Sequence, residues 1–84
     1  MIAIASDHAG FPLKEEIKKF LEEKNIEFID CGAHSTDSVD YAKFAQVACL
    51  KVTEGYADKA ILCCGTGIGI SMAANKVKGI RAAC

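Results

Sequence analysis

The stretch that decides the fold is Ala60-Ile61-Leu62-Cys63-Cys64-Gly65-Thr66-Gly67-Ile68-Gly69-Ile70-Ser71-Met72-Ala73-Ala74-Asn75-Lys76. An apolar run comes first, three glycines at alternate positions follow, and a second largely apolar segment closes it. Glycine allows tight turns and lets backbone N–H groups come close to a ligand. The N-terminus of a following helix adds free N–H groups and a dipole that attract anions. The stretch therefore predicts a buried strand, an anion-binding loop and a helix.

The chemistry of this loop depends on Cys64, which stands at the end of the expected strand. A thiol in this place can act as a nucleophile or a base beside an oxyanion site. The spacing G-x-G-x-G differs from the dinucleotide fingerprint G-x-G-x-x-G, and Ile70 stands where a P-loop carries lysine. The loop is thus an expected anion site without assignment to NAD or ATP. Glycines that serve only the geometry of the turn are the alternative interpretation.

Four apolar segments are expected to be strands: residues 1–6, 26–31, 59–63 and 80–84. Helical spacing fills the gaps between them. The first helix starts near Pro12, the second begins at Tyr41 and stops near Gly55, and the third is short and ends at about Asn75. The expected apolar face of the first helix consists of Leu13, Ile17, Phe20 and Leu21.

The order β-α-β-α-β-α-β predicts an α/β fold and a single domain over residues 1–84. We expect a three-layer α/β/α Rossmann-like parallel sheet with right-handed crossovers, which reaches about its fourth strand. Ligands bind such sheets beyond the carboxyl ends of the strands. Asp7 and His8 follow the first strand, and Cys64 to Gly69 follow the third, so both loops should face one pocket. A surface role for His8, and a core position for Tyr41 behind an Asp40 helix cap, are the alternatives.

Composition narrows the class of protein. The formal net charge of 84 residues is -1, which gives no electrostatic footprint for nucleic acid. No apolar run reaches membrane-spanning length, and the N-terminus lacks the charge and length of a signal peptide. Five cysteines, an odd number, then indicate free thiols in a reducing cytoplasm. Cys63 and Cys64 are adjacent, which suits neither a C-x-x-C pair nor a zinc site, and Cys31 and Cys49 are expected to be buried apolar residues.

These motifs together resemble the type B ribose-5-phosphate isomerase family, which also includes the galactose-6-phosphate isomerase subunits. The matching blocks spread over all 84 residues, and the last two are the most specific. They are Ser6-Asp7-His8-Ala9-Gly10, Asp30-Cys31-Gly32, Val39-Asp40-Tyr41, Cys64-Gly65-Thr66-Gly67-Ile68-Gly69, and Ala73-Ala74-Asn75-Lys76 with Gly79-Ile80-Arg81-Ala82-Ala83.

The resemblance implies an aldose–ketose isomerase that interconverts ribose 5-phosphate and ribulose 5-phosphate through an enediolate, with no cofactor and no metal. Cys64 would be the base that moves a proton between C1 and C2, and Thr66 would assist ring opening. The backbone amides of the glycine loop would hold the enediolate oxygens. The implied substrate-binding set is Asp7, His8, Tyr41, Gly65, Thr66, Gly67, Ile68 and Gly69.

The same resemblance implies a small sugar phosphate as the partner and a homodimer or higher homo-oligomer. Family members are longer, and their phosphate ligands and a ring-opening histidine would lie beyond Cys84, so the isolated chain is expected to be inactive. Three alternatives stay open. They are an allose- or galactose-6-phosphate isomerase, a non-catalytic sugar-phosphate or anion-binding module, and a thiol redox protein that uses Cys63 and Cys64.

Overall fold

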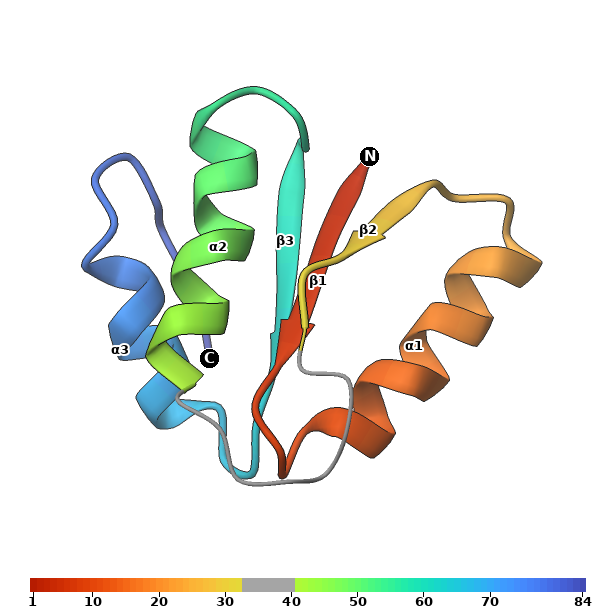
Figure 1. The fold of residues 1–84 in the computed structure, drawn as a ribbon, viewed down its shortest axis with the longest axis horizontal. Coiled ribbons are helices and arrows are strands. Elements are labelled where there is room, and N and C mark those ends of the chain that lie inside the picture. The colour runs from red at the N-terminus through yellow and green to blue at the C-terminus, as the bar shows by residue number, and fades with distance from the viewer. Residues whose placement is uncertain (33–40) are drawn as a thin grey trace.

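A computed structural model describes residues 1–32 and 41–84, apart from the side chain of Tyr41. Strands and helices alternate along these residues (Figure 1). The elements are β1 (Ile2–Ser6), α1 (Phe11–Glu23), β2 (Phe28–Asp30), α2 (Tyr41–Thr53), β3 (Lys59–Cys63) and α3 (Ile68–Asn75). The predicted α/β order is confirmed through the third helix.

The sheet has β1 at its centre, in the order β2-β1-β3, and both pairings are parallel. Ile4 lies opposite Asp30 on one side and Ile61 on the other, and Ser6 lies opposite Cys63. Because the three strands run in one direction, their carboxyl ends reach the same edge of the sheet. Figure 1 shows that edge at the bottom, where β1 passes into α1 and β3 into α3.

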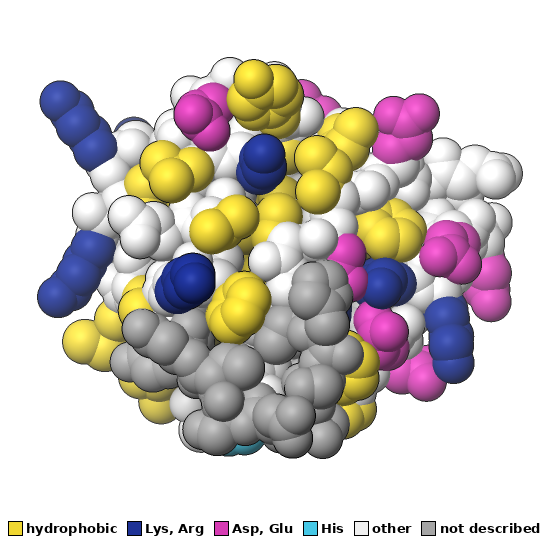
Figure 2. Space-filling view, in the orientation of Figure 1, with side chains coloured by type: hydrophobic (Ala, Val, Ile, Leu, Met, Phe, Trp, Pro, Cys, Tyr) yellow, Lys and Arg dark blue, Asp and Glu magenta, His cyan; other side chains and the backbone are white. Residues whose placement is uncertain are grey.

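The buried face of α1 differs from the predicted one. Leu21 is buried, whereas Leu13 and Phe20 are 55% and 53% exposed, so the prediction was wrong at these two positions. Lys14 is fully buried instead, because its ammonium pairs with Asp30 at the end of β2 and turns this side of the helix towards the sheet. The outer surface over α1 carries intermixed acidic and basic side chains (Figure 2).

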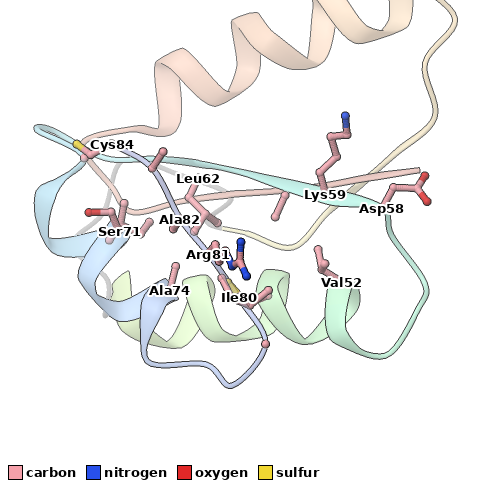
Figure 3. A pocket seen from close by; sticks show the side chains of 16 residues that line it. Val52, Asp58, Lys59, Leu62, Ser71, Ala74, Ile80, Arg81, Ala82 and Cys84 are labelled. Atoms are coloured by element: carbon pink, nitrogen blue, oxygen red, sulfur yellow. The ribbon is translucent and has the colours of Figure 1, made fainter.

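Helices cover both faces of the sheet, with α1 on one side and α2 and α3 on the other (Figure 3). Ala3, Ile4 and Ala5 of β1 are fully buried, as is typical of a parallel strand that is covered on both faces. Towards α2, Ala3 and Ala5 pack in one cluster with Ala48. These small side chains let α2 lie close to the sheet, and the three-layer Rossmann-like arrangement is confirmed.

The predicted fourth strand at residues 80–84 was wrong, because this segment forms no strand. A cavity of about 480 Å³ is lined by residues of this segment and of β3 (Figure 3). The side chain of Asn75 binds the segment instead. Ala82 N donates to Asn75 Oδ1 at 2.9 Å, and Asn75 Nδ2 donates to Ala82 O at 3.0 Å. A side-chain amide thus occupies the two backbone groups that a strand partner would need.

Some element ends also differ from the sequence expectations. β2 is shorter than the predicted strand at residues 26–31, and α3 begins at Ile68 rather than after Gly69. The expectation for Asp40 lies outside the described residues. In the part of the chain that the structure describes, no helix has the length and apolar character needed to cross a bilayer.

Candidate active site

The loops after β1 and β3 adjoin at the carboxyl edge of the sheet, as predicted. Asp7 N donates to Cys63 O at 3.1 Å, which ties the first loop to the end of β3. Gly10 packs on the Cys63–Cys64 peptide so closely that a Cβ there would overlap the Cys63 carbonyl and lie 2.6 Å from Cys64 N. Only glycine fits this position, so the first loop is fixed against the start of the second.

Asp7 and His8 occupy the first loop. The Asp7 side chain is buried, and its Oδ1 accepts the Gly10 N–H at 2.8 Å, which closes the turn into α1. Among the described residues the second carboxylate oxygen meets no donor. His8 is half-buried, and its Nδ1 is shielded from solvent without a hydrogen-bond partner in residues 1–32 and 41–84. A carboxylate oxygen and a shielded imidazole nitrogen, neither with a partner among the described residues, suit the hydroxyl groups of a polar ligand.

The glycine loop is shaped by two short bonds of its own. Gly67 N donates to Cys64 Sγ at 2.9 Å, and Ile68 N donates to Thr66 Oγ1 at 3.2 Å. Gly67 has a φ of 81°, in the left-handed region that favours glycine, and it caps the N-terminus of α3. Cys64 is half-buried and Thr66 is exposed, so the thiol and the hydroxyl lie at the surface of the loop.

The remaining amides of this loop are available to a ligand. The first helical bond of α3 runs from Ser71 N to Gly67 O, so the N–H groups of Gly69 and Ile70 precede the helical ladder. These two amides, and those of Gly65 and Thr66, meet no acceptor among the described residues. The arrangement can bind an anionic oxygen. The expected set from Gly65 to Gly69 therefore divides into amides with internal partners and amides without.

The two adjacent cysteines have different surroundings. Burial, with the neighbouring Cys64, raises the pKa of the Cys63 thiol. Burial also raises the pKa values of Cys31 and Cys49. These three thiols are therefore protonated at neutral pH. The Cys64 sulfur accepts an N–H bond at a helix N-terminus. Within the described residues, no three His, Cys, Asp or Glu side chains are grouped as a metal site would require.

A buried ion pair beside the first loop was not foreseen from the sequence. Lys14 Nζ lies 2.8 Å from Asp30 Oδ1, and Lys18 Nζ lies 2.8 Å from Asp30 Oδ2. Burial alone would raise the pKa of Asp30, but the hydrogen bonds from Lys14, Lys18 and Gly32 lower it to about 2. The only sequence signal for this pair is that Lys14 lies seven positions before Leu21, on the same side of the helix.

One expectation about the site lies outside the described side chains, and the cavity lies elsewhere than expected. The side chain of Tyr41 lies outside the described part of the chain, so its role stays a prediction. The cavity of about 480 Å³ is lined by Leu62, Ile70 and Ile80 and reaches the glycine loop only at Gly67, away from Asp7 and His8. The large cavity is therefore distinct from the meeting point of the two loops.

Comparisons with known proteins agree with this geometry. A family model described as Ribose/Galactose Isomerase matches residues 2–84. Ribose-5-phosphate isomerase B of Escherichia coli (strain K12) is 51% identical over 81 residues, which make up 96% of this chain and 54% of that protein.

Solved structures give the same result. Ribose-5-phosphate isomerase B of Clostridium thermocellum superposes with a TM-score of 0.96 at 52% identity, over 98% of this chain and 55% of the other. The enzyme of that name from Mycoplasma genitalium, with bound ribulose-5-phosphate, superposes with a TM-score of 0.90 at 45% identity, over 98% and 56%. This chain spans about half the length of these relatives. It belongs to the ribose/galactose isomerase family.

Proposed function

We propose that this chain carries the reacting end of an aldose–ketose isomerase that interconverts ribose 5-phosphate and ribulose 5-phosphate. The observation that carries the proposal is the position of Cys64. Cys64 directly follows β3, and its sulfur accepts the Gly67 N–H at 2.9 Å. The carbonyl of the preceding Cys63 accepts the Asp7 N–H, which brings the Asp7 loop to this point. Family membership and the relatives' names support a sugar phosphate as the substrate.

In the proposed reaction Cys64, as the thiolate, removes the proton from C2 of the open-chain aldose. The electron pair of the C–H bond forms a C1–C2 double bond, and the aldehyde oxygen becomes the enediolate oxygen. A proton passes from the C2 hydroxyl to the C1 oxygen, and return of the abstracted proton to C1 then gives the ketose. An N–H donor and a helix N-terminus favour the thiolate form of a cysteine, so the bond from Gly67 supports this assignment.

The negative charge that develops on the enediolate needs donors that are already in place. The amides of Gly65, Thr66, Gly69 and Ile70, which have no internal acceptor among the described residues, could supply them. Such donors act strongly because they need no reorganisation as the reaction proceeds, and removal of one commonly costs about 3–4 kcal/mol of transition-state stabilisation. The amides of Gly67 and Ile68 would act indirectly, by shaping the loop.

The remaining residues would hold and open the sugar. The Asp7 carboxylate oxygen that has no partner among the described residues and the His8 imidazole would bind hydroxyl groups of the sugar. The Thr66 hydroxyl would assist ring opening. Tyr41 would line the site from the start of α2. The proposed active form is a homodimer or a higher homo-oligomer, which light scattering on the purified protein would check.

The test follows the proton that the reaction moves. Ribose 5-phosphate is incubated with the protein in D₂O. Proton NMR records the loss of the signal from the proton on C2 and the appearance of ribulose 5-phosphate. Within a protein of the relatives' full length, we expect the unchanged chain to give exchange and Cys64→Ala to lower it by at least about a hundredfold, the lower range for a general base. Cys63→Ala is the matched control, because Cys63 points to the other face of the strand.

The same experiment separates the alternatives. Binding of the sugar phosphate without exchange would identify a non-catalytic binding module. Faster exchange with galactose 6-phosphate or allose 6-phosphate would move the substrate preference within the family, whose description names galactose as well as ribose. Equal exchange rates for Cys64→Ala and the unchanged protein would remove Cys64 as the base.

A further inference from the structure

The ion pair of Lys14 and Asp30 takes no part in the proposed reaction, yet it lies beside the loop that the reaction uses. Lys14 is fully buried, and its Nζ donates to both oxygens of Asp30, at 2.8 and 2.9 Å. Lys14 Nζ also lies 5.2 Å from the centre of the Phe11 ring, in the first turn of α1. A charge of this kind at the start of a helix fixes where that helix begins relative to the sheet.

On one side, the ion pair is linked to the first loop through α1. Asp7 Oδ1 accepts the Gly10 N–H at 2.8 Å, and Gly10 O accepts the Lys14 N–H at 2.9 Å. The Lys14 side chain then reaches Asp30 at the end of β2. Each contact in this path joins the loop to α1 or α1 to the sheet.

On the other side, the same carboxylate is linked back to β1. Asp30 Oδ1 accepts the Gly32 N–H at 2.9 Å, and Gly32 O accepts the Ser6 N–H at 2.6 Å. Ser6 precedes Asp7 in the chain, so the bonds close a ring around the loop. Asp7 N also donates to Cys63 O, which fixes the ring against the residue before Cys64.

We propose that Lys14 and Asp30 are positioning residues, which hold Asp7 and His8 at a fixed place relative to Cys64. The role of this place in sugar binding rests on the proposed function, whereas the ring itself rests on the contacts alone. Two parallel strands end side by side here, but their pairing does not fix the position of one following loop relative to the other. The ring fixes this relative position, because it links α1, β2 and β1 through one carboxylate.

A purely stabilising role fits these contacts less well. A buried ion pair often gives no more stability than apolar side chains of similar volume, because removing two charges from water is costly. Asp30 accepts from three donors at two places, namely Lys14 and Lys18 of α1 and the Gly32 amide after β2. An apolar pair would fill the same space and could not direct the Gly32 amide or the start of α1.

The test replaces the pair by apolar side chains. The double variant Lys14→Met/Asp30→Leu keeps the volume and leaves no unpaired buried charge, so it is expected to fold. The matched control is Glu16→Leu/Lys19→Met, which removes an exposed ion pair of the same helix. Ligand-free NMR follows the Gly10 amide and the His8 ring, and calorimetry measures the dissociation constant of ribose 5-phosphate.

We expect the Gly10 and His8 signals to move in the Lys14→Met/Asp30→Leu variant and not in the control, with affinity falling about tenfold to a hundredfold, as small misplacements of binding groups produce. Unchanged signals and affinity in a folded variant would overturn the proposal. Should that variant not fold, Asp30→Glu keeps the charge pair but moves the carboxylate away from the Gly32 amide. Unchanged Gly10 and His8 signals in Asp30→Glu would then overturn the proposal. Failure of the unchanged protein to bind ribose 5-phosphate would reject the proposed function. The NMR signals recorded without ligand would still test whether Lys14 and Asp30 position the first loop.

Discussion

The loop after β1 and the loop after β3 meet at one sheet edge, but they are held in place by different means. The first is buried at Asp7 and Gly10, closed by the Asp7 carboxylate, and packed by Gly10 against a neighbouring backbone. The second is largely exposed at Gly65 and Thr66, and short bonds to the Cys64 sulfur and the Thr66 hydroxyl shape it. The first loop uses one Asp7 oxygen for its own structure and offers side-chain groups to a ligand, whereas the second offers backbone amides.

This difference separates stability from binding. A site works well when its reacting groups are held against a rigid support, and the first loop with the Lys14–Asp30 pair provides such a support. Changes in the first loop should therefore lower the free energy of unfolding. Changes in the glycine loop should alter ligand affinity more than stability. The following predictions test this separation.

The largest expected effect is that of Gly10→Ala. The new Cβ would overlap the Cys63 carbonyl, which is backbone and cannot rotate away, so the free energy of unfolding should fall by about 3 kcal/mol. Gly65→Ala is the control in the other loop, because its Cβ would meet only the Ala9 Cβ, at 3.6 Å. Urea unfolding measures both variants, and equal stabilities would contradict the comparison.

The next largest effect is a loss of stability in acid, through Asp30. The pKa of Asp30 is lowered from 3.8 to about 2, so its contribution is complete above pH 3.8 and is lost as the pH falls towards 2. A difference of this size corresponds to about 2 kcal/mol. Carbon NMR of the Asp30 carboxyl in the folded protein, with urea unfolding at pH 5 and pH 2.5, checks it. Asp58→Asn removes an exposed carboxylate, and in this variant the loss at low pH should persist.

Gly67→Ala should lower affinity as well as stability. Its φ of 81° strains any other residue by about 1–2 kcal/mol, and the Cβ would lie 3.1 Å from the Cys84 sulfur, beside the loop amides. Gly55→Ala has the same kind of strain, at a φ of 86°, with no atom within 4 Å. Both variants should lose similar stability, but only Gly67→Ala should weaken ribose 5-phosphate binding, by about tenfold for 1.4 kcal/mol. Calorimetry that gives equal affinities would show that this loop is only a turn.

The smallest effect on stability is expected for Thr66→Val. It removes the acceptor of the Ile68 N–H at an exposed site, where water can replace it, so about 0.5 kcal/mol should be lost. Thr53→Val, at an exposed hydroxyl that donates to Leu50 O, should lose a similar amount. Isomerisation should slow in Thr66→Val alone. An unaffected rate of isomerisation would show that the Thr66 hydroxyl takes no part in ring opening.

The sequence predicted the elements with strong local signals and missed those that depend on distant partners. β3 has its predicted bounds, because an apolar run ends sharply at a glycine loop. The adjacency of the two loops followed from parallel topology alone. The fourth strand failed because Asn75 binds Ala82, a contact that periodicity does not express.

The same limit applies to the candidate site. Cys64 and its glycine loop could be found from residue types and spacing, since these determine the local backbone. The buried position of Lys14 could not, because apolar spacing assigns a lysine to the outer face of a helix. Only the placement of Asp30 at the end of the neighbouring strand makes burial of that charge acceptable.

The strand order has a consequence for synthesis on the ribosome. β1 emerges first, but one of its edges pairs only after Phe28–Asp30 exists, and the other waits for Lys59–Cys63. Until then Ala3, Ile4 and Ala5, which are fully buried in the folded protein, remain uncovered in the nascent chain. We expect arrested chains that end before β3 to be open to proteases and chaperones, and chains that continue past it to be protected. Of the three strands in the described sheet, the central one is thus made first and gains its second neighbour last.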